Sequence, residues 1–327
     1  MSSDEGVREE EPDLSSNEVI YKYKAAAEII NSNLALKFVV LECKPDAKIV
    51  EMCEKGDNFI TEQCLQFCVL LMAVVAHTHV INDGPVIGSA ADVLAAANTS
   101  AEVALRLVRP GKKNKDVVDA IQKVAAAYDC KTVEGILSHQ LNQFVIDGNK
   151  VVFSVSNVDT TVIDAEFVEN EVYVIDIVTS TSEGKVIMII DVIGFMIFSF
   201  LFVELCNSEP KSLSEKYTTI YKRAVDKDYQ LKMKSSNYIF SEIREKFTFM
   251  PFTLRALEDR KRQFLSLTEC CIDELLQPYP VLYEKQGDLV AHIKFTVLLM
   301  ANGSDKITSH QLKGGFQGCA SPELFLC

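Results

Sequence analysis

Histidines and cysteines are the first side chains to weigh, because their spacing could hold a metal ion. His77 and His79 alternate along a presumed strand, so both rings could face one side and form a metal-binding pair. Val74 supplies no carboxylate to such a pair, which favours ordinary strand histidines instead. The ten cysteines contain no CxxC pair, so their spacing predicts no zinc site.

Basic side chains gather in the charged, helix-like stretch between Ser214 and Gln277. Such a cluster could contact RNA phosphates, although a run of charge is also the usual pattern of a solvated helix face. The sequence leaves both interpretations open. The residues of this possible RNA-facing patch are Lys222, Arg223, Lys232, Lys234, Arg260, Lys261 and Arg262.

The elements that must position these side chains indicate a mixed α/β protein. Ser15 and Glu18 have the spacing of a capping box, which predicts a helix from there to Ile30. Apolar spacing predicts further helices over residues 49–60, 93–108 and 114–124. Strands are predicted at Val133–Leu137, Val151–Val155, Val172–Val178 and Leu289–Leu299. In the last of these, His292, Lys294 and Thr296 alternate with Ile293, Phe295 and Val297.

Length and composition are those of a folded globular chain. Its 327 residues are 48% hydrophobic and 24% charged, enough for one large domain or two smaller ones. A net charge of −13 excludes a surface that is basic throughout, so nucleic-acid binding would have to be local. Residues 1–17 read as an acidic disordered tail with no secretory signal, which predicts a reducing compartment.

Four segments carry a resemblance to a known family. They are AANTSAEVALRLVRPGKKNKDV (residues 96–117), IQKVAAAYDCKTVEGILSHQL (121–141), NEVYVIDIVTSTSEGK (170–185) and QPYPVLYEKQGDLVAHIKFTVLLMANGSDKITSH (277–310). They closely resemble the proliferation-associated, ErbB-receptor-binding protein family, whose members have the pita-bread fold of type 2 methionine aminopeptidase. The match covers roughly residues 1–63, 73–185 and 210–312. The resemblance implies an α/β (α+β) pita-bread domain over residues 18–312, with a helical subdomain at about 214–277.

The resemblance also implies that the metal site of the catalytic relatives is degenerate here. Those enzymes hold two metal ions with two aspartates, one histidine and two glutamates. The first aspartate would lie in a segment that this chain lacks. Asp147 occupies the position where those enzymes carry a second histidine, which contacts the substrate. An ammonium at a ligand position repels a divalent cation, so no metal, no cofactor and no catalysis are expected. The matching ligand positions are Val74 (second aspartate), His139 (histidine), Asp176 and Lys294 (the two glutamates).

Lys294 would lie on the polar-facing side of a strand whose other side is buried. A buried ammonium without a partner is costly, so a carboxylate should lie close by. Asp176 interrupts the apolar strand Val172–Val178, and the family pattern places both residues in one former metal site. We therefore expect a structural ion pair between Lys294 and Asp176, with His139 nearby.

The chain departs from the family pattern in three places. A strand-rich core segment of the family is missing between residues 63 and 73. A foreign apolar insert, Val186 to Glu209, interrupts a sequence that reads GKPK in the family. Every valine codon begins with GT and one glutamate codon ends with AG, so the limits of the insert favour a translated, retained intron. A lineage-specific insertion and a membrane span at residues 186–203 are the alternatives, and one soluble domain on both sides argues against the span. Residues 313–327 form a divergent tail that replaces a lysine-rich one.

The function implied by the resemblance is that of a non-catalytic scaffold in growth and proliferation control. Its partners would be structured RNA, ribosomes and regulatory proteins, and its location the cytoplasm, nucleus and nucleolus. Without the basic tail, RNA affinity and nucleolar retention should be weakened, and the chain is interpreted as an impaired isoform or gene-model variant. A metal-dependent methionine aminopeptidase is the alternative from a different class.

Overall fold

The computed structural model describes most of the chain apart from both ends and much of the apolar insert. The described residues are 14–31, 35–67, 71–81, 84–142, 148, 150–155, 164–184, 187–188, 220–225, 227, 229, 231–247, 250–257, 263–279, 282–283, 287–309 and 316–317.

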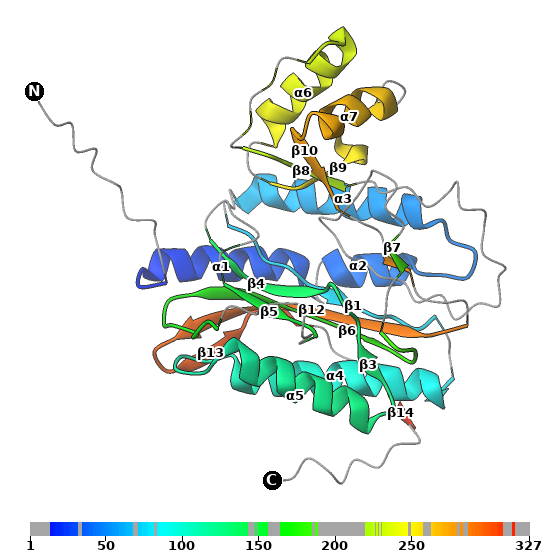
Figure 1. Ribbon diagram of the computed structural model, residues 1–327, viewed down its shortest axis with the longest axis vertical. Helices are drawn as coiled ribbons and strands as arrows, with labels where there is room; N and C mark the ends of the chain where they lie inside the picture. The colour runs from blue at the N-terminus through cyan, green and yellow to red at the C-terminus, as the bar shows by residue number, and fades with distance from the viewer. Residues whose placement is uncertain are drawn as a thin grey trace, which may run out of the picture.

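A seven-stranded sheet forms the centre of the molecule, and its spine runs in the order β1-β12-β6-β4-β5 (Figure 1). β13 adds to β12, and β3 adds to β6. The two longest strands, β6 and β12, are antiparallel, and their register places Lys294 directly opposite Asp176. The strands of this sheet are β1 (Ala76–His77), β3 (Lys131–Thr132), β4 (Leu137–Leu141), β5 (Val151–Phe153), β6 (Val172–Ser180), β12 (Val290–Met300) and β13 (Gly303–Lys306).

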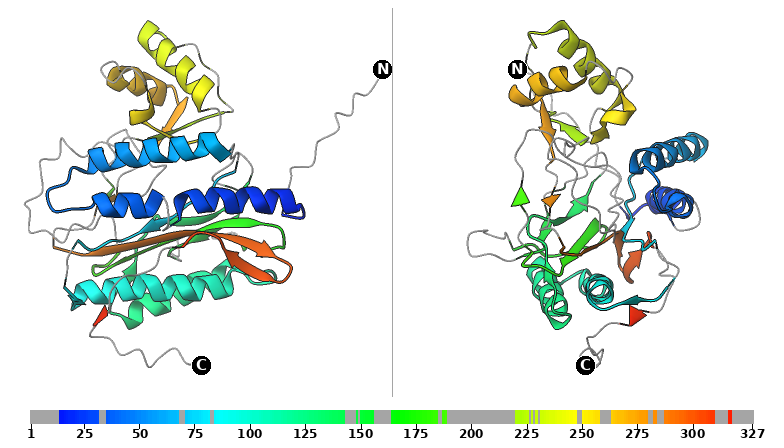
Figure 2. Two further views of the ribbon diagram at one scale, coloured as in Figure 1. Left: turned by 180° about the vertical axis from the view of Figure 1, so that it is seen from behind. Right: turned by 90° about the vertical axis from the view of Figure 1, so that its right-hand side faces the viewer.

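Helices cover the sheet on both sides, as Figures 1 and 2 show. Odd-numbered residues of β6 and β12, such as Tyr173 and Phe295, pack into the main core with α4 and α5. Even-numbered residues near one end of the same strands, such as Val174 and Leu298, pack with Tyr23 of α1. The helices are α1 (Asn17–Ile30), α2 (Ala35–Glu42), α3 (Ile49–Phe67), α4 (Ser89–Leu107), α5 (Asn114–Ala127), α6 (Lys234–Lys246) and α7 (Gln263–Ile272), with a 3-10 helix, η2, at Leu254–Ala256.

A small subdomain carrying α6 and α7 projects from the sheet (Figure 1). It has its own core, in which Tyr221, Ile239, Phe252 and Leu267 are almost fully buried. The sequence predicted a charged helical stretch here, whereas the structure also contains a three-stranded sheet of order β10-β8-β9. Its strands are β8 (Ile220–Arg223), β9 (Phe252–Thr253) and β10 (Leu276–Pro278).

Several local predictions differ from the structure. The strand expected at Val133–Leu137 is wrong, because β3 ends at Thr132 and β4 begins only at Leu137. The first helix also begins one residue later than the spacing of Ser15 and Glu18 predicts: its N-cap is Ser16, whose side chain makes no capping hydrogen bond. The helix α2 was not predicted at all.

The apolar insert and the divergent tail fall largely outside the described residues. The described residues of each form a short strand: β7 (Ile187–Met188) of the insert pairs with β11 (Leu282–Tyr283), and β14 (Phe316–Gln317) of the tail pairs with β2 (Val86–Ile87). Within the described ranges, no helix combines the length and the apolar character needed to span a bilayer. The acidic tail expected at residues 1–17 is described only from Leu14 onward.

Candidate functional site

A buried carboxylate with two basic partners lies on the two central strands. Asp176 of β6 is only 6% exposed, and its Oδ2 lies 2.7 Å from the Lys294 ammonium. Its Oδ1 lies 2.7 Å from Nε2 of His292, two residues earlier on β12. Each carboxylate oxygen therefore has its own basic neighbour. The ion pair expected between Lys294 and Asp176 is confirmed.

Strand geometry explains why these three side chains meet. Successive side chains on a strand point to opposite faces, so His292 and Lys294 share one face of β12. Asp176 stands directly opposite Lys294. It lies two residues along β6 from Val178, the residue opposite His292, so both basic side chains are within its reach. The backbone of this region is fixed from the sides: the Ser138 hydroxyl accepts a 2.8 Å hydrogen bond from Asp176 N, and the Thr78 hydroxyl accepts one of 2.7 Å from His292 N.

The ionisation of Asp176 depends on these neighbours. Burial alone raises the pKa of a carboxyl group because it penalises the charged form. The ammonium of Lys294 and the imidazole of His292 act in the opposite direction and outweigh burial, so the pKa of Asp176 lies well below its usual range. Asp176 is therefore a carboxylate at neutral pH, and it contacts two basic side chains in the interior of the protein.

The other residues assigned to the degenerate metal site lie on the neighbouring strands. His139 of β4 stands opposite Val174 of β6, diagonal to Asp176. Its ring nitrogen Nδ1 lies 3.4 Å from the carbonyl of Gln140, while His292, not His139, takes the second oxygen of Asp176. Val74 precedes β1, and its N–H donates to the Thr296 hydroxyl at 2.8 Å. Asp147 lies outside the described residues.

Chemically, this arrangement suits an ion pair and not a divalent cation. A hard cation requires several carboxylate or carbonyl oxygens converging on one point. Here an ammonium contacts one oxygen of Asp176 at 2.7 Å, and Val74 offers only an apolar side chain. In the described part of the chain, no three His, Cys, Asp or Glu side chains come together as a metal-binding group.

His292 is the member of this cluster that the sequence analysis did not single out. The signal was present in the alternation of β12, which places His292 on the same side as Lys294. It was missed because the family pattern offers no ligand at that position. His77, by contrast, is the last residue of β1, and the strand ends before His79. The proposed His77/His79 pair therefore has no continuous strand to align it.

The basic residues of the possible RNA-facing patch differ in how exposed they are. Lys222 and Arg223 are half-buried on β8, where they stand opposite Gln277 and Leu276. Lys232 and Lys234 are exposed at the start of α6. The remaining members, Arg260, Lys261 and Arg262, lie outside the described residues.

Comparison with known proteins places these features in context. No family model matches the chain. It is 56% identical over 363 residues to a protein named ErbB-3 binding protein 1 from potato, Solanum tuberosum, covering 96% of this chain and 87% of the relative. Because the aligned length exceeds the 327 residues of this chain, the relative carries residues that this chain lacks.

Two solved structures resemble the fold. A thermophilic Arx1 gives a TM-score of 0.76 at 21% identity, covering 94% of this chain and 95% of that one. A methionine aminopeptidase from Thermotoga maritima gives a TM-score of 0.50 at 10% identity, covering 90% and 98%. At such identities the likeness concerns the fold alone, and that fold is the pita-bread architecture of the aminopeptidases.

Proposed function

The chain belongs to the proliferation-associated, ErbB-receptor-binding protein family, and on that premise we propose that it is a non-catalytic binding protein built on an aminopeptidase fold. Its role would be to bring regulatory proteins, structured RNA and ribosomes together in growth control. The chemistry of the fold's ancestral site would be lost, and the fold itself retained as a binding scaffold.

One observation carries the non-catalytic part of this proposal. The family pattern places Asp176 and Lys294 where two metal-binding glutamates would stand, and the two side chains form a buried ion pair at 2.7 Å. An ammonium at this distance supplies the positive charge that a metal ion would otherwise bring. Together with Val74, this pattern argues for a metal-ligand set that is broken at several positions at once.

A direct assay tests the loss of catalysis. The purified chain is incubated with a methionyl peptide and cobalt or manganese, and the release of free methionine is measured beside that of an active methionine aminopeptidase. We expect no release above the rate without protein, and no heat of metal binding by calorimetry. Metal-dependent turnover that disappears in an Asp176→Asn variant would instead assign the chain to the metal-dependent aminopeptidases.

The RNA-binding part of the proposal rests on the exposed start of α6. Lys232 and Lys234 are exposed there, and the ring of Tyr238, one turn after Lys234, is 61% exposed. Basic and aromatic side chains on one surface suit a phosphate backbone and unstacked bases. The net charge of −13 limits such contacts to a local patch, so we expect weak RNA affinity.

Salt dependence measures the number of those contacts. Each phosphate contact adds about 0.7 to 0.9 to the slope of log affinity against log salt, so a local patch should give a shallow slope. Replacing Lys232 and Lys234 together by Glu should flatten it further, whereas Lys123→Glu, on the exposed side of α5, should not. A slope that corresponds to six or more contacts would contradict the weak-binding expectation.

The same proposal extends to the location of the protein. We expect the chain in both cytoplasm and nucleus, with little retention in the nucleolus, because its net charge is −13 and its RNA contacts are expected to be local. Imaging of a fluorescent fusion tests this. Grafting a lysine-rich tail after Gln311 should increase the nucleolar signal, and a strong nucleolar signal without that graft would contradict the expectation.

A further inference from the structure

The side chain of Lys306 is half-buried and has no ion-pair partner among the described residues. Lys306 stands on β13 opposite Val297, so its side chain lies on the odd-numbered face of β12, which packs under α4. Its Nζ lies 4.4 Å from the centre of the Phe295 ring, at the distance of a cation–π contact. The ring attracts the charge of the ammonium and leaves its three N–H donors without a strong acceptor.

Lys294, on the other face of β12, shows how the same sheet satisfies a buried lysine. Its ammonium has an oxygen of Asp176 at 2.7 Å. Burial lowers the pKa of Lys306, and the Glu102 carboxylate on α4 acts against that effect from a longer distance. A partly desolvated ammonium of this kind gains a charge-assisted hydrogen bond from any anion that reaches it.

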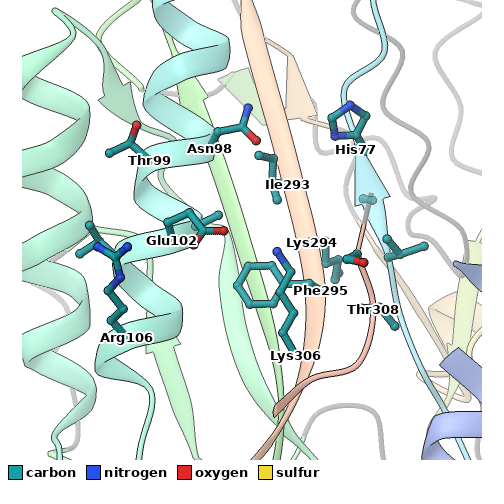
Figure 3. A pocket seen from close by; sticks show the side chains of 15 residues that line it. His77, Asn98, Thr99, Glu102, Arg106, Ile293, Lys294, Phe295, Lys306 and Thr308 are labelled. Atoms are coloured by element: carbon teal, nitrogen blue, oxygen red, sulfur yellow. The ribbon is translucent and has the colours of Figure 1, made fainter. Parts of the chain in front are cut away.

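A cavity of about 380 Å³ gives an anion access to Lys306 (Figure 3). Ile293 and Phe295 of β12 form one wall, and α4 forms the wall that faces them. Figure 3 shows the Lys306 ammonium and the Glu102 carboxylate in the space between α4 and β12. Ligand pockets range from about 300 to 1,000 Å³, so a cavity of this volume suits a small organic molecule.

The wall formed by α4 carries polar side chains along one side of the helix. Asn98, Glu102 and Arg106 follow one another at intervals of four residues, and all three line the cavity. Asn98 Nδ2 donates to the carbonyl of Leu94 at 2.7 Å, which holds the amide against the helix. Glu102 and Arg106 are exposed, so their charges lie toward the solvent end of the wall.

The balance of these charges favours an occupant with a single negative charge. Lys306 and Arg106 contribute two cations, and Glu102 contributes one carboxylate. A monocarboxylate gains the contact with Lys306, whereas the second charge of a phosphate would increase the repulsion from Glu102. The rest of the lining suits a hydrocarbon body because it is largely apolar. Its apolar members include Val75, Ala76, Ala101, Val103 and Ile293.

We propose that the cavity between α4 and β12 binds a small monocarboxylate with an apolar body. The carboxylate accepts from Lys306 Nζ, which keeps its contact with the Phe295 ring. The apolar body lies against Ile293 and the facing side of α4. The charged ends of Lys294 and Asp176 meet on the other face of the sheet, so this site is separate from that ion pair.

Fluorine NMR with three matched probes tests the proposal. The probe is para-fluorophenylacetate, and the comparisons are the neutral para-fluorophenylacetamide and the dianion of para-fluorophenyl phosphate. The full chain is produced as a fusion with a solubility-enhancing carrier, and the carrier alone is the blank. Broadening of each fluorine line with increasing protein concentration gives the Kd of each probe.

We expect the carboxylate to bind at least about tenfold more tightly than the amide or the phosphate. Equal affinity for carboxylate and amide would mean that no cation recognises the probe, and would overturn the proposal. A phosphate that binds more tightly than the carboxylate would overturn it as well, because the site would then not select a single charge. No broadening beyond that of the carrier would likewise overturn it.

Side-chain variants locate the bound carboxylate. Lys306→Met keeps an unbranched side chain and removes the charge, so affinity for the carboxylate should fall at least about tenfold. Lys123→Met, at an exposed position of α5, is the matched control and should bind as the parent chain does. Equal affinities of these two variants would overturn the proposal.

A second variant keeps the test decisive if Lys306→Met does not fold. Glu102 is exposed on α4, so Glu102→Gln changes the charge of the cavity and leaves the core intact. The variant should bind the phosphate more tightly than the parent chain does, and its preference for the carboxylate should shrink. An unchanged preference would contradict a site between Glu102 and Lys306.

Discussion

The carboxylate of Asp176 is held between two basic groups at a depth where an unpaired charge is costly. Lys294 is only 8% exposed and His292 only 6%, so water cannot replace either contact fully. Breaking a buried pair by removing one partner leaves the other charge uncompensated. The stability of the site therefore depends on both members of the pair being present.

Changing Lys294 to Met should destabilise the fold by about 3–5 kcal/mol, because the Asp176 carboxylate then keeps only His292 as a basic neighbour. Urea denaturation at pH 7 measures the change, in a chain that also carries the core segment that the family pattern places after Gln63. Lys24→Met is the matched control. Its ion pair with Asp305 is about half exposed, so that variant should lose no more than about 1 kcal/mol. A loss for Lys294→Met as small as the control's would contradict a buried structural pair.

The same variant should show a characteristic pH dependence. The pKa of folded Asp176 lies below its unfolded value of about 3.9, so the unfolded state binds more protons between these two values. The stabilisation is present above the unfolded pKa and is lost as the pH falls toward the folded pKa. Repeating the denaturation from pH 7 down to pH 3 should therefore narrow the difference between Lys294→Met and the parent chain. A constant difference would point to lost packing of the lysine stem instead.

At this scale the sequence predicted the pair but not its third member. Lys294 and Asp176 are charges in strands that are otherwise apolar, and each needs the other if both are buried. A histidine can satisfy its ring nitrogens with many kinds of polar group, so nothing in its residue type required it to lie beside this carboxylate. Only the β6–β12 register, which puts it opposite Val178, brings its ring near Asp176.

Among the elements, α5 packs on the sheet through its apolar face, and the side chain of Asn114 adds polar contacts at the start of the helix. Asn114 is only 1% exposed, and its Oδ1 accepts from the backbone N–H of Ala165 at 3.1 Å. Its Nδ2 donates to the carbonyl of Val151, in β5, at 3.0 Å. The helix start, a strand and the loop before β6 therefore share one buried amide group.

Replacing Asn114 by Ala should cost roughly 1–3 kcal/mol, because it leaves the N–H of Ala165 and the carbonyl of Val151 without this partner. Thermal denaturation measures the loss. Asn114→Asp keeps the acceptor and removes the donor, so its loss should be intermediate. Lys115→Ala, at the next and exposed position, is the control and should be nearly neutral. An Asn114→Ala variant as stable as that control would mean that other contacts hold the helix.

Element prediction succeeded where periodicity was long and failed where it was short. The alternation around Ile293 and Phe295 predicted β12, and the apolar spacing from Val93 to Val108 predicted α4. A two-residue strand such as β3 exists because a long neighbour pairs with it, and no local pattern predicts it. The sheet in the α6–α7 subdomain was missed for the same reason.

At the scale of the whole molecule, a well-filled core lies under a sheet whose described strands end at β1. The odd-numbered face of β6 and β12 packs under α4 and α5 as in a complete domain. Among the described strands, β1 is the last on one side of the sheet, and it borders a cavity of about 380 Å³. Edge strands that are neither covered nor charged promote association between chains. We therefore expect the segment that the family pattern places before β1 to matter for the behaviour of the molecule in solution as well as for its fold.

We expect the chain as written to aggregate or to be degraded, because losing the strands that the family pattern places before β1 would uncover apolar surface and a sheet edge at the same time. Size-exclusion chromatography and a thermal scan test this in three versions of the protein. Removing Val186–Glu209 alone should not produce a monodisperse species, since that change does not cover β1. Removing it and also inserting the relative's segment between Gln63 and Ala73 should give a monomer with one cooperative transition. The unaltered chain would contradict this expectation if it were monodisperse and unfolded in a single cooperative step, because the edge at β1 would then be protected within the chain itself.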